Sequence, residues 1–112
     1  MYRERSKILK NWKENVEKVA SGAHSLLKNC EVYAFGSAIT GRLTAASDID
    51  VLIIAEDLPK KIMKRAKLKV RIERLAKLPA CHPIQIHLIE KDELKRSSIY
   101  SEVARNEQKE RF

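Results

Sequence analysis

Apolar and polar positions along this chain follow two periods, and each period predicts a different kind of element. From residue 3 to residue 28, apolar side chains recur every three or four positions, which predicts one amphipathic helix. Val32–Phe35 is a short apolar run and Pro83–Ile89 alternates between apolar and polar residues, so both predict strands. Asp48–Ala55 is apolar on both faces beyond its acidic start, which predicts a strand in the middle of a sheet.

Further helical segments are predicted between and after these strands. Residues 59–77 follow two acidic residues, begin at a proline and end before another proline, as helices commonly do. Residues from Glu90 onward begin with a helical pattern, and the last seven, 106–112, are expected to fray. Residues 37–43 predict a single helical turn, which Ser37 caps and a glycine ends.

Length and composition limit the class of protein. A chain of 112 residues with 44% hydrophobic residues fits one globular domain, residues 1–112. The longest apolar run, Val51–Ala55, is far too short to span a membrane, and the N-terminal segment lacks the apolar region of a secretory signal. We therefore expect a cytoplasmic protein that does not bind membranes. Cys30 and Cys81 predict two small buried thiols rather than a disulfide.

The net charge of +8 is concentrated in one segment of the chain. Residues 60–77 contain nine Lys or Arg residues and one Glu, whereas the rest of the chain is electrically balanced. On a helix, five of these cations would fall within about 80° of one another. This basic stripe has three interpretations: a solvated helix face, a docking site for an acidic protein, or a surface that binds nucleic acid phosphates. Its members are Lys60, Lys64, Lys67, Arg71 and Arg74.

Two carboxylates open the second predicted strand. Asp48 and Asp50 are two residues apart, so on a strand they point to the same side, about 6–7 Å apart. Like charges held this close repel each other unless a cation joins them, and Mg²⁺ or Mn²⁺ prefers such oxygen ligands. The alternative is a plain acidic start to a solvated strand. The pair alone does not decide between these interpretations.

A glycine–serine pair at the end of the first predicted strand suggests a place for phosphate. Gly36 has no side chain, so an anion can approach its backbone closely, and Ser37 lies where a helical turn begins. Gly-Ser is also common in ordinary turns. Its position beside a strand that carries Asp48 and Asp50 favours one nucleotide site, with phosphates on the turn and a metal ion on the carboxylates.

These motifs together resemble the signature of a known superfamily. Gly36-Ser37, ten intervening residues and then Asp48-Ile49-Asp50 resemble the nucleotidyltransferase superfamily that includes DNA polymerase β. The short chain, with Gly41 and the Ser47-Asp48 pair, resembles its minimal nucleotidyltransferase group. The resemblance implies an α/β (α+β) fold, in which a short mixed sheet of three or more strands carries helices mainly on one face. It also implies that the Gly-Ser pair binds nucleotide phosphates and that the two Asp bind Mg²⁺.

The sequence departs from this family pattern at two places. Many minimal members have an Arg just before the second glycine, but here Thr40 occupies that position and Arg42 follows the glycine. Members usually carry a third carboxylate on a later strand, where this chain has Gln85. A glutamine offers a carbonyl oxygen to a metal but cannot take up a proton. His87, on the same side of that strand, is either a candidate base or an ordinary packed side chain.

The resemblance and the basic stripe together lead to three hypotheses about function. The first is an enzyme that transfers a nucleoside monophosphate from an NTP, ATP by default, to an acceptor hydroxyl with Mg²⁺ or Mn²⁺. The second is a weakly active or inactive nucleotide-binding partner of a small helical HEPN-type protein, as in toxin–antitoxin pairs. The third is a nucleic-acid accessory protein that uses the basic helix 59–77. A homo-oligomer is left open. The expected catalytic residues are Asp48, Asp50, Gln85 and His87, and the expected nucleotide ligands are Gly36, Ser37, Arg42 and Ser47.

Overall fold

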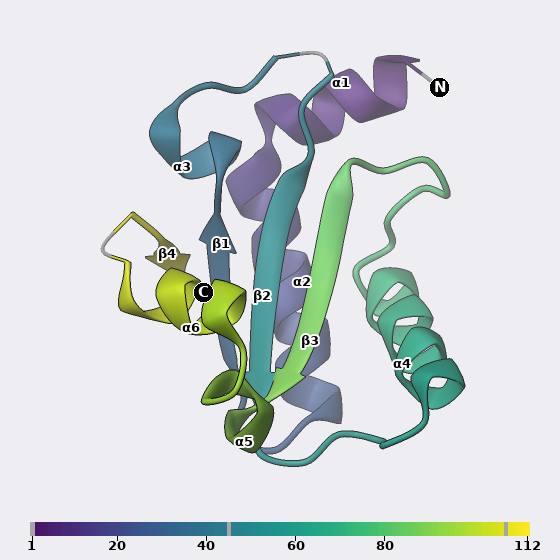
Figure 1. Cartoon of the computed structure of the whole chain (residues 1–112). Helices are drawn as coiled ribbons and strands as arrows, with labels where there is room; N and C mark the ends of the chain where they lie inside the picture. Colours follow the sequence, from purple (N-terminus) through teal and green to yellow (C-terminus); the bar gives the residue numbers. More distant parts are fainter. Residues whose placement is uncertain (1, 45, 107) are drawn as a thin grey trace.

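A four-stranded mixed sheet forms the centre of the protein (Figure 1). The computed structural model describes residues 2–44, 46–106 and 108–112. The strands lie in the order β3-β2-β1-β4; β1 is antiparallel to β2 and β4, and β2 is parallel to β3. The elements are α1 (Tyr2–Lys10), α2 (Trp12–Leu26), β1 (Glu31–Phe35), α3 (Ser37–Thr40), β2 (Ile49–Ala55), α4 (Ile62–Leu75), β3 (Ile84–Glu90), α5 (Lys91–Leu94), α6 (Ser98–Arg105) and β4 (Glu110–Arg111).

The two faces of the sheet have separate apolar contacts. Val51 and Ile53 of β2 point into the main core, which α2 and α4 cover. Leu52 and Ile54 point to the other face, where residues of α5 and α6 pack against them. The predicted fold class is therefore confirmed: the long helices α2 and α4 pack on one face, and the short α5 and α6 cover part of the other (Figure 1). Because β2 lies between two strands and two apolar layers, all of its residues except Asp50 are buried.

The prediction of a single N-terminal helix over residues 3–28 is wrong. The chain forms two helices, α1 and α2, which are separated at Asn11. Asn11 has the non-helical angles φ −108° and ψ 37° and makes no side-chain capping hydrogen bond, while its carbonyl accepts from the Asn15 N–H at 3.1 Å. The bend lets α1 cross the end of the sheet beside the loop that follows α3, with Ile8 still buried in the core (Figure 1).

Helix α4 is shorter than the predicted range 59–77. It begins at Ile62, because the preceding backbone is extended and held by a buried carboxylate on β3. That carboxylate belongs to Glu90, which is 4% exposed. It accepts a hydrogen bond from the Leu58 N–H at 3.0 Å and forms an ion pair with Lys60 Nζ at 2.9 Å. The helix ends at Leu75, two residues before Lys77, which has a φ of +56°.

The prediction that residues 106–112 fray is also wrong for the part of the tail that the structure describes. Strand β4 pairs with the edge of β1, and the Phe112 N–H donates to the Val32 carbonyl at 2.8 Å. The Phe112 ring lies 6.2 Å from the Trp12 ring in an edge-on arrangement. The tail therefore covers an otherwise open strand edge, a favourable contact that the polar composition of the tail does not reveal.

In the described part of the chain, no helix is long and apolar enough to cross a membrane.

Candidate nucleotide-binding and metal site

Three strands bring the predicted site residues to the same end of the sheet. Because β1 and β2 are antiparallel, the end of β1 lies beside the start of β2, and the parallel strand β3 starts at the same end. In this register Phe35, Asp50 and Gln85 are neighbours across the sheet. Asp48 immediately precedes β2. The site therefore forms where the sequence predicted that two strands would meet, with a third strand completing it.

Hydrogen bonds tie the carboxylates to the two predicted residues of β3. Gln85 Nε2 donates to Asp48 Oδ2 at 3.1 Å. His87 Nε2 lies 3.3 Å from Asp50 Oδ1, with both side chains about one-quarter exposed. Since a carboxylate only accepts hydrogen bonds, Nε2 carries the proton in this contact. The structure thus confirms that Gln85 and His87 lie on the same side of the sheet as the carboxylates.

Tyr100 is a member of this cluster that the sequence analysis did not identify. Its hydroxyl lies 3.0 Å from His87 Nδ1, and the two rings are 5.6 Å apart. In the tautomer that carries its proton on Nε2, Nδ1 accepts the hydrogen bond of the Tyr100 hydroxyl. Tyr100 lies on α6, which packs on this face of the sheet. The amphipathic pattern of α6 indicated that one face of this helix packs against the sheet. The sequence did not show which strand that face would contact.

The Gly-Ser turn stands directly beside the metal-binding candidate Asp50. Gly36 has φ +80°, and a Cβ atom at this position would lie 2.9 Å from Asp50 Oδ2. The positive φ strains any residue that has a side chain, and a Cβ atom here would also force the Asp50 carboxylate to move. The expectation that Ser37 caps the helical turn is wrong: Gly36 is the N-cap, and Ser37 is the first helical residue. A positive φ is required just before the turn, which places the glycine rather than the serine there. Gly41 ends the turn in a left-handed conformation, as predicted.

Arg42 and Ser47 lie in the loop between α3 and β2. The Arg42 N–H donates to the Ser37 carbonyl at 3.0 Å, and the residue is exposed. Ser47 Oγ accepts a hydrogen bond from the Thr44 N–H at 2.8 Å, which shapes the loop that leads to Asp48. Their role as nucleotide ligands stays a prediction.

The donor atoms of this site fit Mg²⁺ or Mn²⁺ that substrate phosphates help to coordinate. Asp48 is exposed, and Asp50 is partly exposed next to the space that Gly36 leaves open. Among the described residues, no group of three or more His, Cys, Asp or Glu side chains could hold a metal ion. Two carboxylates with the Gln85 amide nearby therefore make an open site, and Mg²⁺ often uses one or two carboxylates together with water and phosphates.

Glu90, the next acid on β3, serves a different purpose. The hydrogen bond from Lys60 and that from the Leu58 N–H lower the pKa of Glu90 below its usual range. The neighbouring Glu93 is bonded to Arg65, which likewise lowers the pKa of Glu93. Glu90 ends β3, whereas Gln85 lies near its start, so this ion-pair cluster is at the opposite end of the strand from the two aspartates. It fixes the start of α4 and supplies no third carboxylate.

The basic stripe divides into three parts. Lys60 precedes α4 and is paired with Glu90, so its predicted place on the helix is wrong. Lys64 lines a hollow at the start of α4 together with residues 57–61. The remaining cations line an apolar groove on the outer side of the helix, which we call the α4 groove. Its residues are Met63, Ala66, Lys67, Val70, Arg71 and Arg74.

A mixed sheet with a glycine turn beside paired aspartates is the arrangement of a nucleotidyltransferase domain. The model of the nucleotidyltransferase domain family matches residues 6–111, and the chain belongs to this family. A crystal structure at 1.40 Å of a "putative nucleotidyltransferase" from Sulfolobus solfataricus is similar, with a TM-score of 0.52 and 26% sequence identity. The match covers 86% of this chain and 78% of that one. No curated protein sequence matches the chain.

Proposed function

We propose that the protein transfers a nucleoside monophosphate from an NTP, ATP by default, to an acceptor hydroxyl with Mg²⁺ or Mn²⁺. The observation that carries this proposal is the position of Gly36 against Asp50, with Asp48 two residues away. This arrangement offers a place for phosphates next to two ligands for a cation. Membership of the nucleotidyltransferase family supports the reaction class.

Each residue of the site has a role in this proposal. Gly36 and Ser37 bind the NTP phosphates through a backbone that no side chain obstructs. Asp48 and Asp50 hold the metal ion, which aligns the α-phosphate and neutralises charge that develops on it. Gln85 orients Asp48 through its hydrogen bond, and His87 orients Asp50.

The test is Mg²⁺-dependent diphosphate release and label transfer from ATP labelled on the α-phosphate. Asp48→Asn removes one ligand charge and should lower the rate about 100-fold or more. Asp57→Asn is the matched control, because Asp57 lies beyond the other end of β2, about 20 Å away at the usual rise of a strand. Full activity of Asp48→Asn would rule out the proposal.

A second candidate function is that of an NTP-binding partner with little turnover. Gln85 occupies the position on β3 opposite Asp50, where family members usually carry the third carboxylate. Its amide bonds to Asp48 but cannot accept a proton from an acceptor hydroxyl. Gln85→Asp distinguishes the two functions. A large gain in transfer supports the partner function, and a loss supports the enzyme as it stands.

The α4 groove suits an acidic protein partner, such as a small helical HEPN-type protein. Met63 is 71% exposed and Val70 is 43% exposed, which is unusual for large apolar side chains on a helix. Lys67, Arg71 and Arg74 flank them. An amphipathic partner helix with acidic edges would bury the apolar strip and pair with these cations. A nucleic acid would gain nothing from Met63 and Val70, so the groove favours protein over nucleic acid.

Binding assays with variants of the groove test this surface. Met63→Ser and Arg71→Glu should each weaken capture of an acidic helical HEPN-type protein, whereas Lys18→Glu, an exposed change on α2, should not. RNA binding that falls with Arg71→Glu but is unchanged by Met63→Ser would instead indicate the nucleic-acid function.

A further inference from the structure

The Tyr100 hydroxyl stands beside the proposed nucleotide site. It lies 3.0 Å from Nδ1 of His87, and the other ring nitrogen of His87 lies 3.3 Å from Asp50 Oδ1. A single imidazole ring therefore separates this hydroxyl from a carboxylate to which the proposed function assigns the metal ion. A hydroxyl is also the group that the proposed function requires of an acceptor.

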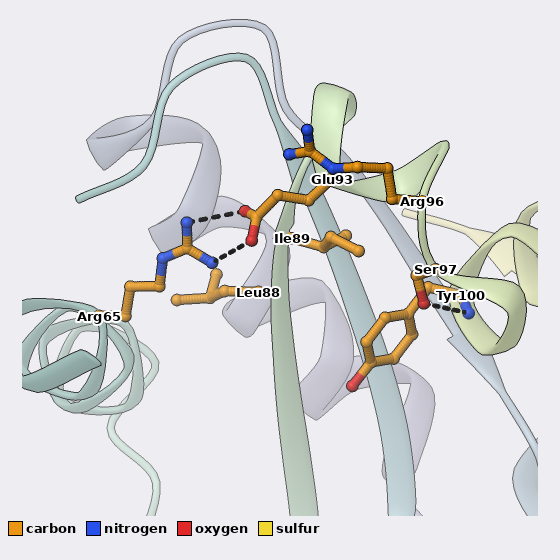
Figure 2. A pocket seen from close by; sticks show the side chains of 7 residues that line it. All are labelled: Arg65, Leu88, Ile89, Glu93, Arg96, Ser97 and Tyr100. Carbon is orange, nitrogen blue, oxygen red and sulfur yellow. Dashed lines mark hydrogen bonds and ion pairs between the residues drawn. The ribbon is translucent and has the colours of Figure 1, made fainter. Parts of the chain in front are cut away.

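Contacts within α6 and with β3 hold the Tyr100 side chain in this position. Ser97, the N-cap of α6, accepts a hydrogen bond from the Tyr100 N–H at 3.2 Å, which fixes the first turn of the helix. The Tyr100 ring lies 5.6 Å from the His87 ring. Figure 2 shows the hydroxyl pointing away from Glu93 and Arg96, which follow the far end of β3. It therefore points toward the end of the sheet where the site lies.

The order of the strands places this hydroxyl on the side from which an acceptor would attack. In phosphoryl transfer the attacking and leaving oxygens lie roughly in line on opposite sides of the phosphorus atom. The Gly36–Ser37 turn follows β1, Asp50 lies on β2, and His87 lies on β3, with β2 between the other two strands. With the leaving diphosphate on the turn, the attacking oxygen comes from the side of β3, where Tyr100 is held. This step rests on the proposed function.

We propose that Tyr100 is a self-modification site, whose hydroxyl accepts the nucleoside monophosphate when no external acceptor is bound. The phenolic oxygen forms a bond to the α-phosphorus while the bond from that phosphorus to the bridging oxygen breaks. Diphosphate leaves, and the hydroxyl proton passes along its hydrogen bond to His87 and then to water. The product is a phosphodiester between Tyr100 and the nucleoside. Because the hydroxyl is held in place by the fold, the reaction is intramolecular and requires no second substrate.

The product should block the site in which it forms. A nucleotide attached to Tyr100 stays next to Asp50 and the Gly36–Ser37 turn, so another NTP cannot bind there. Each chain therefore accepts a single nucleotide and then stops. The modification would act as a switch that closes the site when NTP is present and no acceptor is bound.

The first experiment incubates the whole chain with ATP and Mg²⁺ and no added acceptor. Intact mass should increase by one adenylate, and peptide mass spectrometry should locate it on Tyr100 among the three tyrosines, Tyr2, Tyr33 and Tyr100. The rate per chain should not depend on protein concentration, because the transfer is intramolecular. The modified chain should no longer bind a non-hydrolysable ATP analogue with Mg²⁺.

A second experiment tests the position of the hydroxyl without nucleotide transfer. The reagent 5′-fluorosulfonylbenzoyl adenosine replaces the phosphates of ATP with a sulfonyl fluoride that reacts with tyrosine hydroxyls, and it needs no metal ion. We expect it to modify Tyr100, and we expect the ATP analogue with Mg²⁺ to protect Tyr100 from it.

Tyr33→Phe is the matched control for Tyr100→Phe. The Tyr33 hydroxyl donates to Glu31 at 2.8 Å, at the start of β1 and so at the opposite end of this strand from Gly36. Tyr100→Phe should therefore remove both the adenylate and the reagent label, whereas Tyr33→Phe should retain both.

Three results would overturn the proposal. The first is that the ATP analogue binds with Mg²⁺ but the adenylate is found on another residue or on none. The second is that the reagent modifies Tyr33 as readily as Tyr100. The third is a rate per chain that rises with protein concentration, which would show transfer between chains. Failure of the ATP analogue to bind would contradict the proposed function instead, because that measurement does not involve the Tyr100 hydroxyl as an acceptor.

Discussion

Gly36 stands so close to Asp50 that a Cβ atom at position 36 would lie 2.9 Å from the carboxylate oxygen Oδ2. Gly36→Ala should therefore displace Asp50 or the turn and reduce Mg²⁺-dependent nucleotide transfer at least about tenfold, as expected when a catalytic group is misplaced by about 1 Å. The residue also has φ +80°, which adds backbone strain of about 1–3 kcal/mol. Transfer kinetics and chemical denaturation measure the two effects separately.

Gly41 provides the matched control for this prediction. Its φ is +74°, but a Cβ atom there would meet nothing within 4 Å. Gly41→Ala should cost about 1 kcal/mol of stability because of its left-handed backbone, with transfer largely retained. Equal loss of activity in the two variants would show that the contact between Gly36 and Asp50 has no special role.

The pair His87 and Tyr100 should act on transfer as a unit. His87→Asn removes the contact with Asp50, and Tyr100→Phe removes only the hydroxyl that bonds Nδ1. If Tyr100 acts by positioning His87, the double variant should lose less transfer than the sum of the two single losses. The coupling free energy, calculated from the kcat values of the four proteins, should be about 0.5–3 kcal/mol. The KM for ATP should change little. If the effects of the two single variants on transfer simply add in the double variant, Tyr100 does not act through His87.

Acid stability should depend on Glu90. Its pKa is lowered in the folded state by the hydrogen bonds from Lys60 and the Leu58 N–H, relative to an unfolded value of about 4.3. The stabilisation is thus fully present above that pH and is lost as pH falls through the lower folded pKa. Glu90→Gln should lower stability at neutral pH and flatten its dependence below about pH 4. Denaturant titrations from neutral to acidic pH test this, with Glu17→Gln, an exposed change on α2, as the control.

The contact between Phe112 and Trp12 should make the C-terminal strand visible by fluorescence. Trp12 is the only tryptophan, so its emission reports this contact directly. Phe112→Ala should shift the emission and cost about 1–2 kcal/mol, less than for a fully buried ring because Phe112 is partly exposed. Ile99→Ala, at a side chain that is 70% exposed, should change stability by no more than about 0.5 kcal/mol. Unchanged emission in Phe112→Ala would contradict the packing of the tail.

The sequence predicted the sheet and the site better than the ends of the helices. Hydrophobic runs identify strands because each strand buries its own residues, so β2 was found together with the glycine turn and the aspartates beside it. The start of α4 could not be found this way, because it depends on Glu90, which lies 30 residues from Lys60. Tyr100 was missed for the same reason, since its partner His87 is on another element.

The C-terminal strand shows a similar limit. Residues 106–111 are polar and have no periodic pattern, and the order of β4 and Phe112 depends on the free edge of β1 and on Trp12. Pairing with a distant strand edge leaves no local signal in so short a segment. Composition therefore predicted fraying where tertiary contacts produce a strand.

Mg²⁺-dependent NTP binding tests the central claim most directly, because it requires no knowledge of the acceptor. Titration calorimetry with a non-hydrolysable ATP analogue, with and without Mg²⁺, compares the unchanged protein with Asp50→Asn and Asp57→Asn. We predict binding that requires Mg²⁺, weakens at least about tenfold in Asp50→Asn and is unchanged in Asp57→Asn. Binding that is independent of Mg²⁺ and equal in all three proteins would contradict the assignment of Asp50 and the Gly36–Ser37 turn to one nucleotide site.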